Sequence, residues 1–156
     1  MDTTMRAPTQ SPELVELEPH EAAVTHISGA PDELRTLLGD AFEATMQHIA
    51  ISGAQVAGPP FARYLSFEPR IEAEVGFPYI GTLTTSDRVR QVALPGGRAV
   101  LMTHVGPYEE IAAAWGRVSA WASEQGLVPS SPAWESYLTG PDDPGAPVTQ
   151  IVLPVR

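Results

Sequence analysis

The stretch Pro132-Ala133-Trp134-Glu135-Ser136-Tyr137-Leu138 places one carboxylate among aromatic and apolar residues, in a segment with the composition of a short β-strand. Side chains alternate between the two faces of a strand, so Glu135 and Tyr137 share one face and Trp134 takes the other. Glutamate is depleted in strands and is rarely buried without a partner. Two interpretations are open at this point. Glu135 belongs either to an edge strand and points into water, or to the floor of an aromatic pocket that receives a cation.

The composition is that of a single globular domain. The chain has 156 residues, of which 43% are apolar, and it has no cysteine. This length is sufficient to bury a core without disulfides, and the absence of cysteine excludes a thiol nucleophile or a thiolate metal site. The N-terminus has no apolar segment typical of a signal peptide, and no run reaches the roughly 18 apolar residues of a membrane span. We therefore expect a soluble, cytoplasmic protein.

The charge balance is strongly acidic. Nineteen acidic residues stand against nine basic ones, all of them arginine, for a net charge of −10. Such a field repels phosphate backbones and anionic membranes and concentrates cations. We therefore expect no direct nucleic-acid partner and no membrane partner. The alternative interpretation is that the acidic surface serves only solubility.

Hydrophobic periodicity predicts an α+β fold. Residues 1–12 resemble a flexible tail, and strands are predicted at 14–17, 22–28, 61–67, 71–80, 89–94, 99–104, around Trp134 and at 148–155. Two helices are predicted after Pro31 and Pro107, where acids suit the helix N-terminus, and they should end at Gly53 and Gly126. Their apolar stripes comprise Leu34, Leu37, Leu38, Ala41, Phe42, Thr45, Met46 and Ile49 in the first helix, and Ile111, Ala112, Trp115, Val118 and Ala122 in the second.

The two halves of the chain resemble each other, which suggests an internal duplication. Thr25-His26-Ile27 recurs as Thr103-His104-Val105, and Tyr64-Leu65 recurs as Tyr137-Leu138. We predict pseudo-repeats at about 13–80 and 88–156, each an antiparallel sheet with one helix on its outer face, related by a pseudo-two-fold axis. A ligand cleft should lie where the halves meet, with the two tyrosines facing each other across it.

Several ordered motifs resemble the GyrI-like small-molecule-binding family over roughly residues 13–155. They are Pro60-Phe61-Ala62-Arg63-Tyr64, Glu72 to Pro78, Gly97 to Val100, His104 to Glu109, Trp115 with Trp121, and Trp134 to Leu138. The resemblance implies a duplicated fold with a cleft between the halves and a single ligand-binding domain at 13–156. It also implies that Glu135, in the family's Glu-x-Tyr strand, is the partner of cationic ligands.

The candidate ligand-binding residues are Glu135, Tyr137, Tyr64, Tyr108, Trp115, Trp134, Phe61 and Glu74. Aromatic rings would cover the flat apolar body of a lipophilic cation, while Glu135 would compensate its charge. Each aromatic residue has an alternative role in the core, and Trp134 lies on the strand face opposite Glu135. Glu74 either supplies a second carboxylate or belongs to a solvated edge.

The sequence favours the first of three functions. The first is binding of hydrophobic, preferably cationic small molecules, for multidrug sequestration or sensing as an effector-binding domain. The second is hydrolysis of strained cyclopropane-type antibiotics, which the resemblance also includes, with Glu135 activating water and Tyr137 or Tyr108 protonating the leaving group. The third is a protein-partner role such as gyrase inhibition, or a homodimer. We expect no cofactor and no metal site, because His26 and His104 lack a third ligand.

Overall fold

The computed structural model describes residues 11–140 and 143–156, so most of the predicted tail lies outside the described residues. The strands are β1 (Glu13–Leu17), β2 (His20–Gly29), β3 (Gln55–Val56), β4 (Phe61–Ser66), β5 (Ile71–Ile80), β6 (Val89–Leu94), β7 (Gly97–Val105), β8 (Trp134–Tyr137) and β9 (Val148–Pro154). The α-helices are α1 (Leu34–Ile51) and α2 (Ile111–Glu124). Each follows a 3-10 turn, η2 (Pro31–Glu33) or η3 (Tyr108–Glu110).

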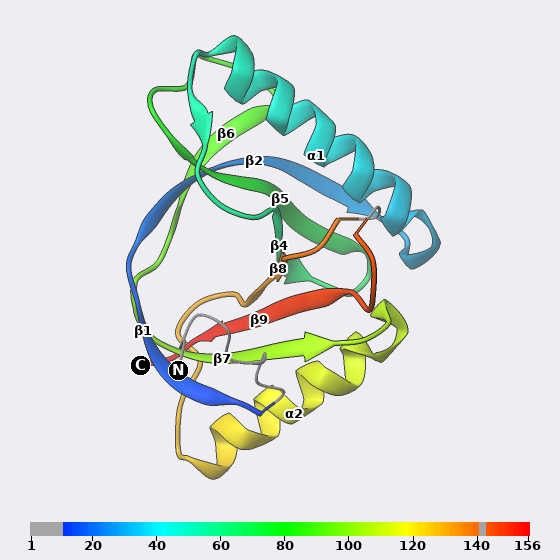
Figure 1. The fold of residues 1–156 in the computed structure, drawn as a ribbon, viewed down its shortest axis with the longest axis vertical. Helices are drawn as coiled ribbons and strands as arrows, with labels where there is room; N and C mark the ends of the chain where they lie inside the picture. The colour runs from blue at the N-terminus through cyan, green and yellow to red at the C-terminus, as the bar shows by residue number, and fades with distance from the viewer. Residues whose placement is uncertain (1–10, 141–142) are drawn as a thin grey trace.

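All strands belong to one curled antiparallel sheet, rather than to two separate sheets (Figure 1). Their order is β1-β7-β9-β8-β4-β5-β2-β6, and β3 pairs with β5. The strands of the second half occupy the β7-β9-β8 side and those of the first half the β4-β5-β2 side, and the halves meet where β4 pairs with β8. The first strand of each half pairs with a strand of the other half: β1 pairs with β7, and β6 pairs with β2. The order is therefore symmetric about the β4–β8 junction, although a common origin of the halves stays a prediction.

Both helices pack on the same face of this sheet. A continuous row of cross-strand partners crosses it through Thr25, Val75, Ala62, Glu135, Ile151 and Met102. Partners in such a row point to one side. Helix α1 packs over Val75 at one end, whereas Val118 of α2 packs over Ile151 and Met102 at the other. Glu135 therefore lies at the centre of the sheet, on the face that carries both helices.

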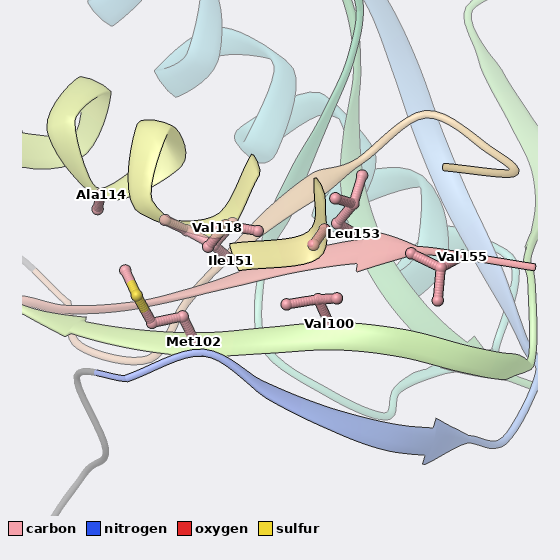
Figure 2. Packing of buried hydrophobic residues seen from close by; sticks show 8 residues of the cluster. Val100, Met102, Ala114, Val118, Ile151, Leu153 and Val155 are labelled. Carbon is pink, nitrogen blue, oxygen red and sulfur yellow. The ribbon is translucent and has the colours of Figure 1, made fainter. Parts of the chain in front are cut away.

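The two faces hold separate hydrophobic clusters. Figure 2 shows the cluster under α2, where Ala114 and Val118 meet residues of β7 and β9. The opposite face holds a second cluster of Ala22, Val24, Phe61, Leu94, Ala99, Trp134 and Val152. Strands from both ends of the sheet contribute to this second cluster, so the sheet curls around it and the helices cover the outer face. Within the described residues, no helix is long and apolar enough to span a membrane.

The predicted elements agree closely with the structure, with local corrections. Gly53 and Gly126 follow the two helices in the left-handed conformation, with φ of 76° and 72°. Two residues of the predicted apolar stripes are exposed, Met46 in α1 and Ala112 in α2. The 3-10 turns begin at Pro31 and Tyr108, so His104 occupies the place of Ile27 rather than that of His26. The Thr25/Thr103 match is therefore wrong by one residue, because Thr25 faces α1 whereas Thr103 faces the opposite side.

A buried hydroxyl pair joins α1 to the sheet and gives a first prediction. Thr45 Oγ1 donates to the Ala41 carbonyl at 2.7 Å and lies 2.8 Å from Thr25 Oγ1. Because that proton is already used, Thr25 must donate to Thr45. Thr45→Val leaves the buried Thr25 donor without an acceptor, at a cost of about 1–3 kcal/mol. Thr25→Val removes the donor itself and should cost less.

Chemical denaturation of Thr25→Val, Thr45→Val and the double variant measures this asymmetry in the free energy of unfolding. The double variant should be close to, or more stable than, Thr45→Val alone, because neither hydroxyl is then unsatisfied. Equal losses in the two single variants would contradict the assigned direction of the hydrogen bond.

Candidate functional site

The candidate site is built around the carboxylate of Glu135, which is only 7% exposed. Strand β8 presents this side chain beside Ala62 of β4 at the junction of the two halves. Its Oε2 accepts a hydrogen bond from Trp115 Nε1 of α2 at 2.5 Å, and its Oε1 accepts one from the Tyr137 hydroxyl at 2.7 Å. Two neutral donors thus hold the carboxylate in one orientation.

Aromatic rings enclose this carboxylate. Tyr137 makes edge-to-face contacts with Phe42 of α1, with ring centroids 6.1 Å apart, and with Tyr108 of η3 at 6.2 Å. Tyr64 of β4 belongs to the same apolar cluster as Tyr137 and stacks on Phe67 at 5.2 Å. Both helices, the turn η3 and two central strands therefore contribute to one site. Tyr108 is 49% exposed and forms its solvent-facing side.

The charge of Glu135 is poorly compensated. Burial raises the pKa of its carboxyl group, and the hydrogen bonds from Trp115 and Tyr137 oppose that shift. Within the described residues, the contacts of carboxylates with arginine or histidine are Arg63–Glu74 and His26–Glu72, so Glu135 has no cationic partner there. The site therefore holds a desolvated acid whose ionised form lacks a countercharge.

The neighbouring tyrosines remain protonated at neutral pH. Burial, reinforced by the charge of Glu135, raises the pKa of Tyr64 to about 12. Burial and the same charge hold the pKa of Tyr137 well above its usual value. The two hydroxyls therefore act as hydrogen-bonding groups around the carboxylate and do not serve as bases.

Five of the predicted ligand-binding residues come together in the structure, namely Glu135, Tyr137, Tyr64, Tyr108 and Trp115. Phe42 and Phe67 join them but were not predicted as site residues. Phe42 appeared in the sequence only as part of the apolar stripe of α1, and no signal marked Phe67.

The structure does not bring the other three candidates to this site. Phe61 and Trp134 are buried in the cluster on the opposite face of the sheet, because their neighbours Ala62 and Glu135 take the helix-covered face. Glu74 also lies on that opposite face and forms an ion pair with Arg63 at 2.6 Å. Its charge is thus compensated within the protein.

At the junction of the halves, where the ligand cleft was predicted, the rings of Phe42, Tyr108 and Tyr137 lie in edge-to-face contact. An open cavity of about 450 Å³ lies elsewhere, lined by the loop 81–86 with Tyr79, Glu21 and Gln91. None of the five residues at the Glu135 site lines it. Within the described residues, no three histidine, aspartate or glutamate side chains gather so as to hold a metal ion.

A curled sheet with two helices on one face, and a buried carboxylate among aromatic rings between them, defines the class of small-molecule-binding domains built on this fold. Residues 10–156 match the family described as the GyrI-like small molecule binding domain, and the chain belongs to that family. The resemblance inferred from the sequence motifs is thereby confirmed. No significant match was found among curated proteins.

Several solved structures share this fold. The C-terminal domain of EcmrR superposes with a TM-score of 0.80 at 18% identity, covering 94% of this chain and 97% of that one. A protein described as a hydrolase from Listeria innocua has a TM-score of 0.65 at 17% identity, covering 98% and 95%. SAV2435, described as bound to tetraphenylphosphonium, has a TM-score of 0.60 at 11% identity, with 94% of each chain covered. At these identities the likeness establishes the fold alone.

Another EcmrR structure, described as a DNA complex, matches 94% of this chain but only 57% of its own. The shared part has the fold of the EcmrR C-terminal domain.

Proposed function

We propose that this domain binds hydrophobic cations at Glu135, as a multidrug-binding or sensing module. The observation that carries the proposal is the buried carboxylate with two neutral donors and no cationic partner in the described residues. Burying a charge without a partner costs several kcal/mol, and a bound cation offsets that cost. Charge is then the selective property of the ligand.

The surrounding rings provide a surface for the apolar body of the ligand. Tyr64, Tyr108, Tyr137, Phe42 and Trp115 offer faces and edges on which an aromatic cation packs, and a cation over a ring contributes roughly 0.5–2 kcal/mol. Such contacts impose few directional requirements, which favours breadth of specificity. The tetraphenylphosphonium complex of SAV2435, a protein of similar fold, supports this class of ligand.

Ligand entry requires a movement of side chains. Tyr108 stands on the short turn η3 and is half exposed, whereas Phe42 is anchored in α1. We infer that Tyr108 swings away from Tyr137 to admit the ligand, because its half-exposed ring contacts Tyr137 directly and is carried by a short turn rather than by a helix.

Isothermal titration calorimetry with tetraphenylphosphonium and tetraphenylborate tests this function. The two ions have nearly the same shape and opposite charge, so an apolar surface alone would not favour the cation. We expect the cation to bind at least about tenfold more tightly, since the anion meets the like charge of Glu135. Equal affinities, or tighter binding of the anion, would overturn the proposal.

A second candidate function is hydrolysis of a strained electrophile. A buried carboxyl group with a raised pKa suits general-base chemistry, and one protein of similar fold is described as a hydrolase. In this alternative Glu135 activates water and Tyr137 or Tyr108 protonates the leaving group. Titration with cyclopropane-type antibiotics, followed by mass spectrometry after incubation, separates the two functions. Stoichiometric binding with recovery of unchanged ligand supports the binding function, and a hydrated, ring-opened product supports hydrolysis.

The net charge of the chain also bears on its macromolecular partners. The acidic charge argues against direct binding of nucleic acid or anionic membranes by these residues. A protein partner, a homodimer and a cytoplasmic location stay predictions.

A further inference from the structure

Two buried polar atoms next to the Glu135 site have no hydrogen-bond partner in the described structure. They are His104 Nδ1 of β7 and Thr149 Oγ1 of β9. His104 is 3% exposed and Thr149 is fully buried. Native proteins leave few such groups unsatisfied, because each costs about 1–3 kcal/mol. A pair of them at one place therefore requires an explanation.

The pair lies directly beside Tyr137. Tyr137 and Thr149 are cross-strand partners, as are Thr149 and His104, so the three side chains form one row on the helix-covered face. Neighbours in such a row have Cβ atoms roughly 4.5–5.5 Å apart. Since Tyr137 also bonds to Glu135, the two unpartnered atoms form an extension of the same site.

The fold itself does not demand polar residues at these positions. In the other half of the sheet the corresponding row is Tyr64, Ala73 and Ile27, which are likewise cross-strand partners. Ala73 and Ile27 are buried in the apolar cluster under α1 and carry no polar side-chain atom. The same architecture is thus satisfied by apolar residues on one side, and only the Tyr137 side carries a histidine and a threonine.

The chemistry of the pair is set by the second nitrogen of His104. Its Nε2 lies 3.3 Å from the Pro107 carbonyl oxygen, which can only accept a hydrogen bond. Nε2 therefore carries the proton, and Nδ1 of the neutral ring is an acceptor. The hydroxyl of Thr149 can donate. The pair thus offers one acceptor and one donor, which together complement a single hydroxyl group.

We propose that His104 and Thr149 form a subsite for a hydroxyl group carried by the cationic ligand. The ligand hydroxyl donates to His104 Nδ1 and accepts from the Thr149 hydroxyl, while the cationic centre lies near Glu135. This inference rests on the proposed function and narrows its ligand class to lipophilic cations with a hydroxyl-bearing arm.

Two matched probes test the subsite by calorimetry, namely (3-hydroxypropyl)triphenylphosphonium and n-butyltriphenylphosphonium. They have the same charge and the same number of heavy atoms, and differ only by a terminal hydroxyl in place of a methyl group. An entirely apolar site favours the butyl cation, because burial of a methyl group is favourable and burial of an unpaired hydroxyl is not. We expect the reverse order, with the hydroxypropyl cation binding about 5- to 10-fold more tightly.

Thr149→Val keeps the shape of the side chain and removes its hydroxyl, so it should abolish the preference while changing the affinity for the butyl cation less than about twofold. Thr103→Val, on the opposite face of β7, should keep the preference. A wild-type protein that favours the butyl cation, or a Thr149→Val protein that still favours the hydroxyl, overturns the subsite and leaves the proposed function intact. Failure of both cations to bind overturns the two together.

Discussion

Glu135→Gln should lower the affinity for tetraphenylphosphonium by about 30- to 100-fold. At roughly 7 Å and an effective dielectric constant near 20, the attraction of a cation to this carboxylate is about 2.4 kcal/mol. Glutamine has nearly the same shape as glutamate. Its carbonyl oxygen can accept from Trp115, and its amide can donate to Tyr137 after the tyrosine hydroxyl rotates. The substitution therefore removes the charge and keeps the packing.

Titration of the wild type and the variant with the same cation measures this loss. Glu74→Gln is a matched control, because Glu74 is a comparably buried glutamate whose charge is paired with Arg63 on the opposite face of the sheet. The thermal stability of both variants should be measured beside the titrations. Because Glu74→Gln removes an ion pair, we expect it to destabilise the protein without changing its affinity for the cation. Retention of wild-type affinity by Glu135→Gln would place cation binding elsewhere, and the cavity beside Tyr79 would be the next site to examine.

Much of the fold could be predicted because its signals are local. Glycine after each helix and acids in each 3-10 turn mark the helix ends, and β-branched segments mark the strands. The exchange of β1 and β6 between the halves could not be predicted, since the loops that precede β2 and β7 are compatible with ordinary hairpins. Strand pairing between distant segments depends on packing that no local pattern encodes.

The candidate site could also be predicted only where its signals are local. The alternation within β8 places Glu135 and Tyr137 on one face, but it does not distinguish an edge strand from a central one. Pairing of β8 with both β4 and β9 makes the strand central and buries the carboxylate. The position of Thr149 beside His104 and Tyr137 could not be predicted either, because it depends on the register of three strands.

Affinity for a lipophilic cation should fall as the pH is lowered through the raised pKa of Glu135. Burial raises this pKa in the ligand-free protein, whereas a bound cation favours the ionised carboxylate and lowers it. The cation therefore binds most tightly above the raised pKa, where the site is already ionised. Below it, the affinity should decrease by about tenfold per pH unit, since each binding event must first remove a proton.

Calorimetry in buffers of different ionisation enthalpy measures the protons released on binding. Release should be negligible well above the raised pKa and approach about one proton per ligand below it. The tyrosine hydroxyls do not contribute in this range, because the pKa of Tyr64 is about 12 and that of Tyr137 is also raised. Glu135→Gln should bind weakly with no proton release at any pH between about 4 and 8, the range in which an exposed or buried glutamate titrates. A wild-type affinity that does not vary across this range would mean that the ligand does not meet the carboxylate, whatever its affinity.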